Sequence, residues 1–107
     1  MVKLPEKIKI GAHEYKVLCP YNFRERNDLC GQCNNSLLEI RIDKNDSCGN
    51  HRAESKIIGS FIHEVIHGIS ETWSIGLKEE QVEQLEEGIL AVLIDNGFLK
   101  IGGTDDQ

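Results

Sequence analysis

The sequence has no long apolar run and fewer basic than acidic residues, and each absence excludes a class of protein. No apolar stretch approaches the roughly 18 residues that a membrane-spanning helix needs, so we expect no membrane segment. Residues 1–6 also lack the apolar run of a signal peptide, which predicts a cytoplasmic location. The net charge of −6 argues against a nucleic-acid partner, because binding to phosphates needs a basic surface.

Aromatic residues are also sparse, at 6%, but the hydrophobic content of 39% and the charged content of 28% are ordinary for a globular chain. A chain of 107 residues is large enough for one modest core and too small for a catalytic domain plus a separate substrate-binding module. We therefore expect a single domain over residues 1–107, with a disordered tail at residues 102–107.

Two of the four cysteines, Cys30 and Cys33, form a CxxC pair. Cys19 and Cys48 could complete a four-thiolate zinc site with them, although the spacing matches no standard pattern. A redox CxxC would follow a strand and begin a helix, whereas Cys33 is followed by a turn signal. Free, reduced thiols are the simplest expectation for a cytosolic chain.

The first half of the chain has the alternating pattern of β-strands. Residues 7–10 and 15–18 alternate on either side of a Gly-Ala break, which predicts a hairpin. A second hairpin is expected from residues 29–33 and 37–42, joined by a turn at residues 34–36. Together these segments predict a small antiparallel sheet of about four strands.

In the second half the apolar period changes to about 3.6 residues, which predicts two helices. The first is expected over residues 52–72 and the second over residues 78–96, with Gly97 as a C-terminal stop. The connection between them is short, so the helices should run antiparallel and adjacent in an α+β fold. Five apolar residues of the second helix are expected to face inward: Val82, Leu85, Ile89, Val92 and Leu93.

His63, Glu64 and His67 form an HExxH motif inside the first helix. Residues four apart lie one above the other on a helix, so both imidazoles can bind the same metal ion. Neutral imidazole is a good zinc ligand, and a carboxylate beside a zinc-activated water is the general base of a hydrolysis. The arc that the histidines occupy also carries residues that leave room for a metal ion and a substrate: Gly59, Ser60, Ser70 and Glu71. The motif therefore favours a zinc-dependent hydrolase over two surface histidines on an amphipathic helix.

Two histidines do not complete a zinc site. One large zincin branch has a third histidine six residues after the motif, but that position is Trp73. The remaining common ligand is a glutamate from the next helix, where Glu79, Glu83 and Glu86 border the apolar stripe. Both Glu79 and Glu83 can then come near the metal, and the pattern leaves the choice between them open.

With these residues the chain resembles the gluzincins, zinc peptidases whose third ligand is a glutamate on a helix after the HExxH helix. It is most similar to their minimal members and to small zinc-peptidase-like proteins of phages. The resemblance covers most of the chain and implies a zincin-like domain that hydrolyses a peptide or protein substrate. By resemblance, Glu79 is the third ligand and Glu83 is the acid that hydrogen-bonds a metal-bound imidazole. The family more often has Asp where this chain has Glu83 and a small residue where it has Glu86, so Glu83 stays an alternative ligand.

The resemblance also implies an extended substrate against an edge strand, for which residues 37–42 are the candidate. A further side chain, usually Tyr or His, often stabilises the oxyanion. Four residues are available for that role: Tyr15, Tyr21, His13 and His51. Each is more simply interpreted as a packing or surface residue, and His51 has the best position of the four.

Two other interpretations compete with a peptidase. One is a catalytically weak, zinc-bearing phage-type protein that binds or regulates a host factor. The other is a fold in which zinc only joins the two helices. The intact Glu64 favours the enzyme, since a structural zinc site has no need of a carboxylate at that position.

Overall fold

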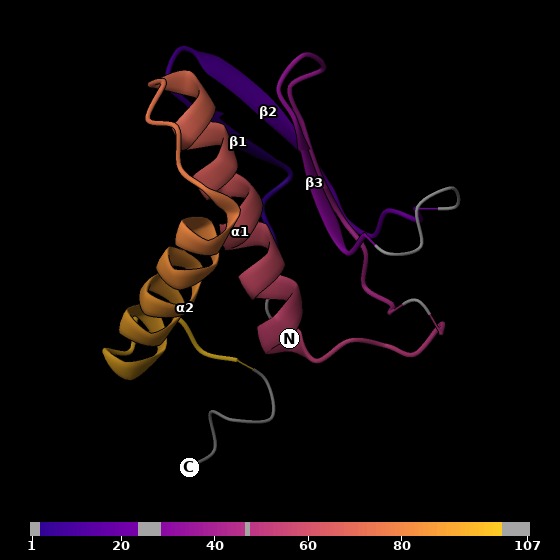
Figure 1. The fold of residues 1–107 in the computed structure, drawn as a ribbon. Coiled ribbons are helices and arrows are strands. Elements are labelled where there is room, and N and C mark those ends of the chain that lie inside the picture. The colour runs from indigo at the N-terminus through magenta and orange to yellow at the C-terminus, as the bar shows by residue number, and fades with distance from the viewer. Residues whose placement is uncertain (1–2, 24–28, 47, 102–107) are drawn as a thin grey trace.

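The computed structural model describes residues 3–23, 29–46 and 48–101, and it confirms the expected α+β fold. Four strands are followed by two helices: β1 (Lys7–Ile10), β2 (His13–Leu18), β3 (Gly31–Asn34), β4 (Glu39–Ile42), α1 (Glu54–Thr72) and α2 (Glu79–Asp95). Figure 1 shows the sheet on one side of α1 and α2 on the other. The tail expected at residues 102–107 lies outside the described residues. In the described part of the chain, neither helix has the length and apolarity that a bilayer crossing requires.

The sheet is mixed, whereas the sequence predicted an antiparallel one. Its order is β1-β2-β4-β3, with antiparallel pairing within the two hairpins and parallel pairing between β2 and β4. β4 therefore lies inside the sheet, and the expectation that residues 37–42 form an edge strand is wrong. Ile40 and Ile42 of β4 are fully buried, while the edge is taken by β3, whose sequence Gly-Gln-Cys-Asn is more polar. Polar edge strands are a common way to avoid unwanted strand pairing.

The core fills the space between the sheet and α1. Its fully or nearly fully buried members come from β1, β2, β4 and α1: Ile10, Tyr15, Ile40, Ile42 and Ile57. Each aliphatic side chain of this kind contributes about 1.5–3 kcal/mol when it is taken out of water. This packing fixes α1 against the sheet and so determines which side of the helix remains free for α2.

A tight turn after α1 sends the chain back along the same helix. Ser74 adopts a left-handed conformation with φ 53°, and the N–H of Ile75 donates to the carbonyl of Ser70 at 2.9 Å. This is the hydrogen-bond pattern of a Schellman motif. The hydroxyl of Ser70 also accepts a hydrogen bond from the N–H of Leu77 at 3.0 Å. The turn therefore places the start of α2, at Glu79, beside the last two turns of α1.

The C-terminal end of α2 agrees with the sequence. Gly97 has φ 78°, and the N–H of Phe98 donates to the carbonyl of Leu93 at 2.9 Å. A glycine in this conformation ends a helix without the steric cost that a side chain would bring. The prediction of Gly97 as the stop is confirmed.

The face that α2 turns toward α1 differs from the expected one. Val82 is fully buried, but Leu85, Ile89 and Val92 are exposed on the outer side of the helix. Among the described residues, α2 packs against α1 alone, so its outer face has no second layer to cover it. The contact face instead includes Glu86, which approaches the backbone of α1. This rotation of α2 directs acidic side chains toward the HExxH motif.

Candidate metal centre

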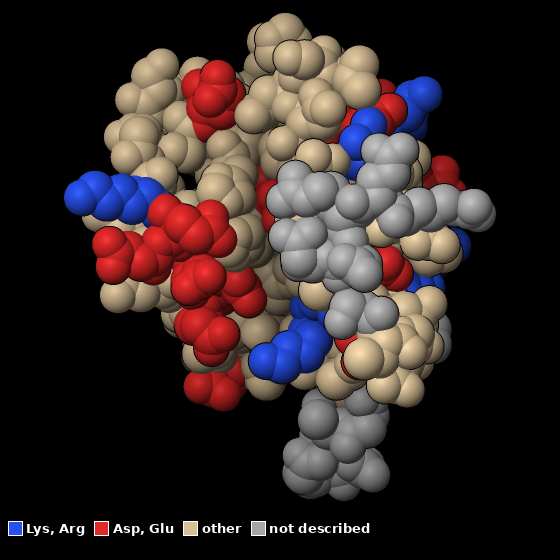
Figure 2. Space-filling view, turned by 45° about the vertical axis from the view of Figure 1, so that its right-hand side comes forward, with Lys and Arg blue, Asp and Glu red and all other residues tan. Residues whose placement is uncertain are grey.

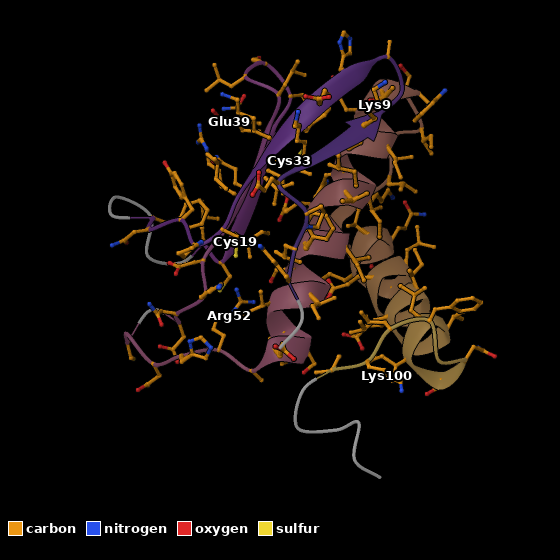
Figure 3. All side chains as sticks on the ribbon, turned by 180° about the vertical axis from the view of Figure 1, so that it is seen from behind. Lys9, Cys19, Cys33, Glu39, Arg52 and Lys100 are labelled. Atoms are coloured by element: carbon orange, nitrogen blue, oxygen red, sulfur yellow. The ribbon has the colours of Figure 1, made fainter. Side chains whose placement is uncertain are left out.

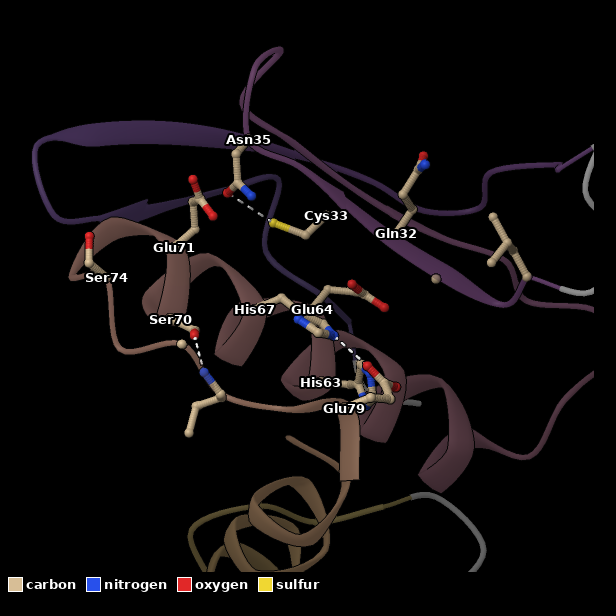
Figure 4. Close-up of a pocket in the computed structure, with 14 residues that line it drawn as sticks. Gln32, Cys33, Asn35, His63, Glu64, His67, Ser70, Glu71, Ser74 and Glu79 are labelled. Carbon is tan, nitrogen blue, oxygen red and sulfur yellow. Dashed lines mark hydrogen bonds and ion pairs between the residues drawn. The ribbon is translucent and has the colours of Figure 1, made fainter. Parts of the chain in front are cut away.

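His63 and His67 lie one turn apart on the side of α1 that faces the start of α2, with ring centroids 4.9 Å apart. Glu79, the first residue of α2, reaches both rings. Its Oε2 lies 2.9 Å from Nε2 of His63, and its Oε1 lies 3.0 Å from Nε2 of His67. One ligand atom from each of the three residues falls within 4.8 Å of the other two. Figure 4 shows the three side chains close together. These residues could therefore hold a metal ion.

The chemistry of this donor set fits a divalent transition metal. Two imidazole nitrogens and one carboxylate are the ligands of many catalytic zinc sites, in which a fourth position stays open for water or substrate. The side chain of His63 is 14% exposed, that of His67 35% and that of Glu79 59%, so the group is open to solvent on one side. The three side chains thus form a partial shell with an accessible face.

Glu86 binds the other ring nitrogen of His63. Its Oε1 lies 2.9 Å from Nδ1, and a neutral ring that donates from Nδ1 presents a free lone pair on Nε2 toward Glu79. The resemblance to gluzincins implied this role for Glu83, which is exposed, whereas the hydrogen bonds to the two histidines come from Glu86 and Glu79. The reason is geometric, because residues seven apart share a helix face and Glu86 lies seven residues after Glu79.

Gly59 on α1 provides the space that Glu86 occupies. A Cβ atom at this position would lie 2.7 Å from Oε2 of Glu86. Gly59, four positions before His63, thus makes room for the carboxylate of Glu86, which orients His63, and not for a substrate. Of the other residues expected to leave room, Ser60 is bound by Arg52, while Ser70 and Glu71 do line the cavity.

Glu64 is 8% exposed and lies on the side of α1 that faces β3, in the same cavity as the metal group. Burial raises the pKa of Glu64 to about 7, and the charges of Glu79 and Glu86 add to the rise. The nearby His63 and a hydrogen bond with the backbone of Cys33 act in the opposite direction. A carboxyl group with a pKa near 7 can accept and return a proton at neutral pH.

The pKa of His63 is raised above its ordinary value of 6.5. Burial alone would lower this pKa, but the hydrogen bond with Glu86 and the charges of Glu64 and Glu79 outweigh it. In the absence of a metal ion, the carboxylates around the ring therefore favour the imidazolium. A bound cation would replace that proton in stabilising the same carboxylates.

The cavity that contains these groups has a volume of about 730 Å³ and lies between α1 and β3. Gly31, Gln32, Cys33 and Asn35 line it on the β3 side. The approach of the strand is close, since a Cβ atom at Gly31 would lie 3.0 Å from Oε2 of Glu64. No sequence pattern indicated that Gln32 would line the cavity, and the pattern at Asn35 indicated only a turn.

The outer edge of β3 has backbone groups that point away from β4. The carbonyl of Cys30 accepts a hydrogen bond from the N–H of Asp43 at 3.0 Å, which places Cys30 in a hydrogen-bonded pair with the β4 side. Because such pairs alternate along an antiparallel ladder, the backbone groups of Gly31 and Cys33 point to the free edge. The free edge of the sheet therefore borders the metal cavity.

The cysteines do not form a second metal site in the described part of the chain. All four are free, and the group that could hold a metal ion there includes none of them. Figure 3 shows Cys19 and Cys33 at separate places along the sheet. Burial, together with the charges of Glu64 and Glu71, raises the pKa of Cys33 to about 11, so its thiol stays protonated at neutral pH.

None of the four residues considered for oxyanion stabilisation lines the metal cavity. Tyr15 is buried and its hydroxyl donates to Oδ1 of Asn35 at 2.8 Å. Tyr21 packs edge-on against another aromatic ring, and His13 is exposed on β2. His51 lines a different cavity, on the N-terminal side of α1. These residues have packing or surface roles.

Comparisons of this chain with protein-family models, with curated proteins and with solved structures found no match. The resemblance to gluzincins therefore rests on the HExxH motif and on the glutamate that follows it. The function is inferred from the residues of this one site and from their geometry.

Proposed function

We propose that this protein is a zinc-dependent metallopeptidase of the gluzincin type. The observation that carries the proposal is the convergence of His63, His67 and Glu79, whose ligand atoms lie within 4.8 Å of one another. The buried Glu64 shares their cavity. Two imidazoles and one carboxylate, with an open side, are typical of catalytic rather than structural zinc. Cobalt or nickel would also bind these ligands, and zinc is favoured by its common use in such sites.

When zinc is bound at these residues, it polarises a peptide carbonyl and makes a water molecule more acidic. Glu64 accepts the proton of that water as the new carbon–oxygen bond forms. Glu64 then returns the proton to the leaving amine as the carbon–nitrogen bond breaks. In the metal-free protein burial raises the pKa of Glu64 to about 7, and a bound cation would lower it again toward the range of a proton acceptor at neutral pH. Glu86 holds the ring of His63 in place throughout.

The free edge of β3 supports a peptide as the substrate. An extended peptide can add to a sheet edge through backbone hydrogen bonds. The N–H and carbonyl of Gly31 and the carbonyl of Cys33 are directed outward there, while the N–H of Cys33 is bound to Glu64. A peptide on this edge would pass in front of Glu64 and the metal group, which line the same cavity. β3 thus takes the role that the sequence had assigned to residues 37–42.

Glu64 also distinguishes this proposal from a metal-bearing binding protein. A site that only joins two helices needs no buried carboxylate beside its ligands, and burying one without a role is unfavourable. Here Glu64 is 8% exposed and lies at the wall of the cavity, opposite β3, where a Cβ atom added at Gly31 would lie 3.0 Å from its Oε2. The surroundings of Glu64 are those of a proton-transfer group.

The test is hydrolysis of a degenerate seven-residue peptide library by the zinc-loaded protein, with new termini read by mass spectrometry. We expect cleavage by the wild type and a loss of at least about 100-fold in Glu64→Gln, because general acid–base groups contribute that much. Glu87→Gln, which makes the same change of charge at an exposed position of α2, serves as the matched control. Zinc-loaded wild type that cleaves no peptide, or cleavage that survives in Glu64→Gln, would contradict the proposal.

A further inference from the structure

Resting on the proposed function, we propose that the cavity selects peptides with a basic side chain on one side of the scissile bond, and that Glu71 binds that side chain. Glu71 is a specificity-determining residue in this proposal and contacts no reacting atom. It lies one helical turn after His67 on α1, so it shares the face of the helix that carries the HExxH side chains.

Glu71 is exposed and lines one end of the cavity. Figure 4 shows Glu71 directed toward Asn35, on the opposite side of the view from Gln32 and Glu79. Asn35 is held by the buried Tyr15, whose hydroxyl donates to Oδ1 at 2.8 Å. This end of the cavity therefore lies between α1 and the turn that follows β3.

Apart from the two histidines of the metal group, the charged side chains that line the cavity are carboxylates. Glu64, Glu71 and Glu79 line it, and no Lys or Arg of the described residues does so. A divalent ion would compensate the carboxylates at the metal group, but Glu71 is not part of that group. Among the described residues, no Lys or Arg forms an ion pair with Glu71. Its charge thus remains available to a substrate.

The surface around the cavity adds to this preference. Figure 2 shows Asp and Glu side chains gathered on the part of the surface that α2 forms. The exposed acidic residues in the first half of this helix are Glu79, Glu80, Glu83 and Glu87, of which only Glu79 lines the cavity. A surface of one sign attracts a ligand of the opposite sign and raises its local concentration. A cationic peptide would therefore be drawn toward the same side of the molecule as Glu71.

The relative direction of β3 and α1 determines which substrate position meets Glu71. Gly31 lies against Glu64, and Sγ of Cys33 lies 3.6 Å from the Cβ position of Gly68, so strand and helix advance together past the metal group. A peptide on the edge of β3 directs alternate side chains toward α1. The peptide side chain that points toward α1 just beyond the metal group reaches Glu71. Leu29 lines the other end of the cavity. The preference for Lys or Arg is thus confined to one side of the scissile bond.

Binding can be measured without turnover on the zinc-loaded Glu64→Gln protein. The probes are three fluorescein-labelled pools of seven-residue Ala/Ser/Gly peptides that contain a single internal Lys, Leu or Glu. By fluorescence anisotropy, we expect the Lys pool to bind about fivefold more tightly than the other two, which is the upper range for a solvent-accessible ion pair. Adding Glu71→Gln should remove this difference, and Glu71→Lys should reverse it in favour of the Glu pool. Glu87→Gln, the matched change outside the cavity, should preserve it.

Equal binding of the three pools, no binding of any pool, or a Lys preference that survives Glu71→Gln would overturn the inference. Zinc content close to that of the parent protein in the Glu71 variants shows that they retain the folded site. Hydrolysis by the zinc-loaded wild type separates this inference from the proposed function. Lys-pool binding without cleavage would refute the peptidase and leave the specificity of the cavity standing. Cleavage that is equal for all pools would leave the peptidase standing and refute the role of Glu71.

Discussion

Oε1 of Glu86 lies 2.9 Å from Nδ1 of His63, on the opposite side of the ring from Glu79, whose Oε2 lies 2.9 Å from Nε2. Two carboxylates from one face of α2 therefore hold a single imidazole of α1. One of them belongs to the group that could hold a metal ion, and the other fixes the orientation of the ring. This relationship connects the packing of the two helices to the metal centre.

Replacing Glu86 should weaken metal binding without removing a ligand. Carboxylates that hydrogen-bond a metal-binding histidine typically contribute 10- to 100-fold to affinity, and we expect a loss of about that size in Glu86→Ala. Competition with a chromophoric chelator would measure the affinity for zinc. The exposed Glu87→Ala serves as the control and should bind zinc as the wild type does. An unchanged affinity in Glu86→Ala would show that the hydrogen bond to His63 has no role in metal binding.

Two helical glycines should respond differently to alanine. Gly88 of α2 has open space around its Cβ position, so Gly88→Ala should stabilise the protein by about 0.5–1 kcal/mol through its higher helix propensity. At Gly59 the new methyl group would lie 2.7 Å from Oε2 of Glu86, and this flexible carboxylate would have to move. We therefore expect Gly59→Ala to lower zinc affinity at little cost in stability. Urea unfolding and chelator competition on both variants would measure these effects, and equal zinc affinities would contradict this account of Gly59.

Gly31 should be required for the position of Glu64. A methyl group there would lie 3.0 Å from Oε2 of Glu64 and 3.3 Å from Cδ1 of Ile42, so strand or carboxylate must shift. Because small displacements of a proton-transfer group are costly, we expect Gly31→Ala to lower peptide hydrolysis by at least about tenfold with unchanged zinc content. Hydrolysis at the wild-type rate would mean that the close approach of β3 to Glu64 has no role in the reaction.

Stability of the metal-free protein should fall as pH rises from 4.5 to about 7. In this range folded Glu64 keeps the proton that the unfolded chain has lost, because its pKa is raised from 4.5 to about 7. Unfolding then releases a proton and is favoured by higher pH, by up to about 3 kcal/mol. Urea unfolding in the presence of a chelator, at several pH values, would measure the effect. Glu64→Gln should be more stable than the wild type at pH 7 and similar to it at pH 4.5, and parallel pH profiles would contradict the raised pKa.

The sequence could predict the elements and half of the site, because these depend on local spacing. The distance of four residues between His63 and His67 places both rings on one helix face wherever α1 packs. Glycine at position 97 ends α2 for reasons of local backbone geometry. The alternation of β4 likewise predicted that Ile40 and Ile42 share a face, and both are fully buried.

The remaining features depend on contacts between elements, which local patterns do not determine. The first hairpin can pair with either strand of the second hairpin, β3 or β4. In the structure β2 pairs in parallel with β4, and β3 therefore lies at the edge of the sheet. The rotation of α2 about its axis was set by its packing on α1 through Val82, and it brought Glu86 rather than Glu83 to His63. Two signals pointed to this result, namely the spacing of seven residues from Glu79 and the small residue at position 59.

The most direct test of the central claim is the zinc content of the protein, purified without a His-tag or added metal and measured by elemental analysis. Four variants would be measured beside the wild type: His63→Ala, His67→Ala, Glu79→Ala and Glu83→Ala. The account predicts about one zinc per chain in the wild type, its loss in the two histidine variants and in Glu79→Ala, and its retention in Glu83→Ala. Zinc that is retained in both histidine variants would contradict the metal centre described for this protein. So would zinc that is lost in Glu83→Ala but retained in Glu79→Ala.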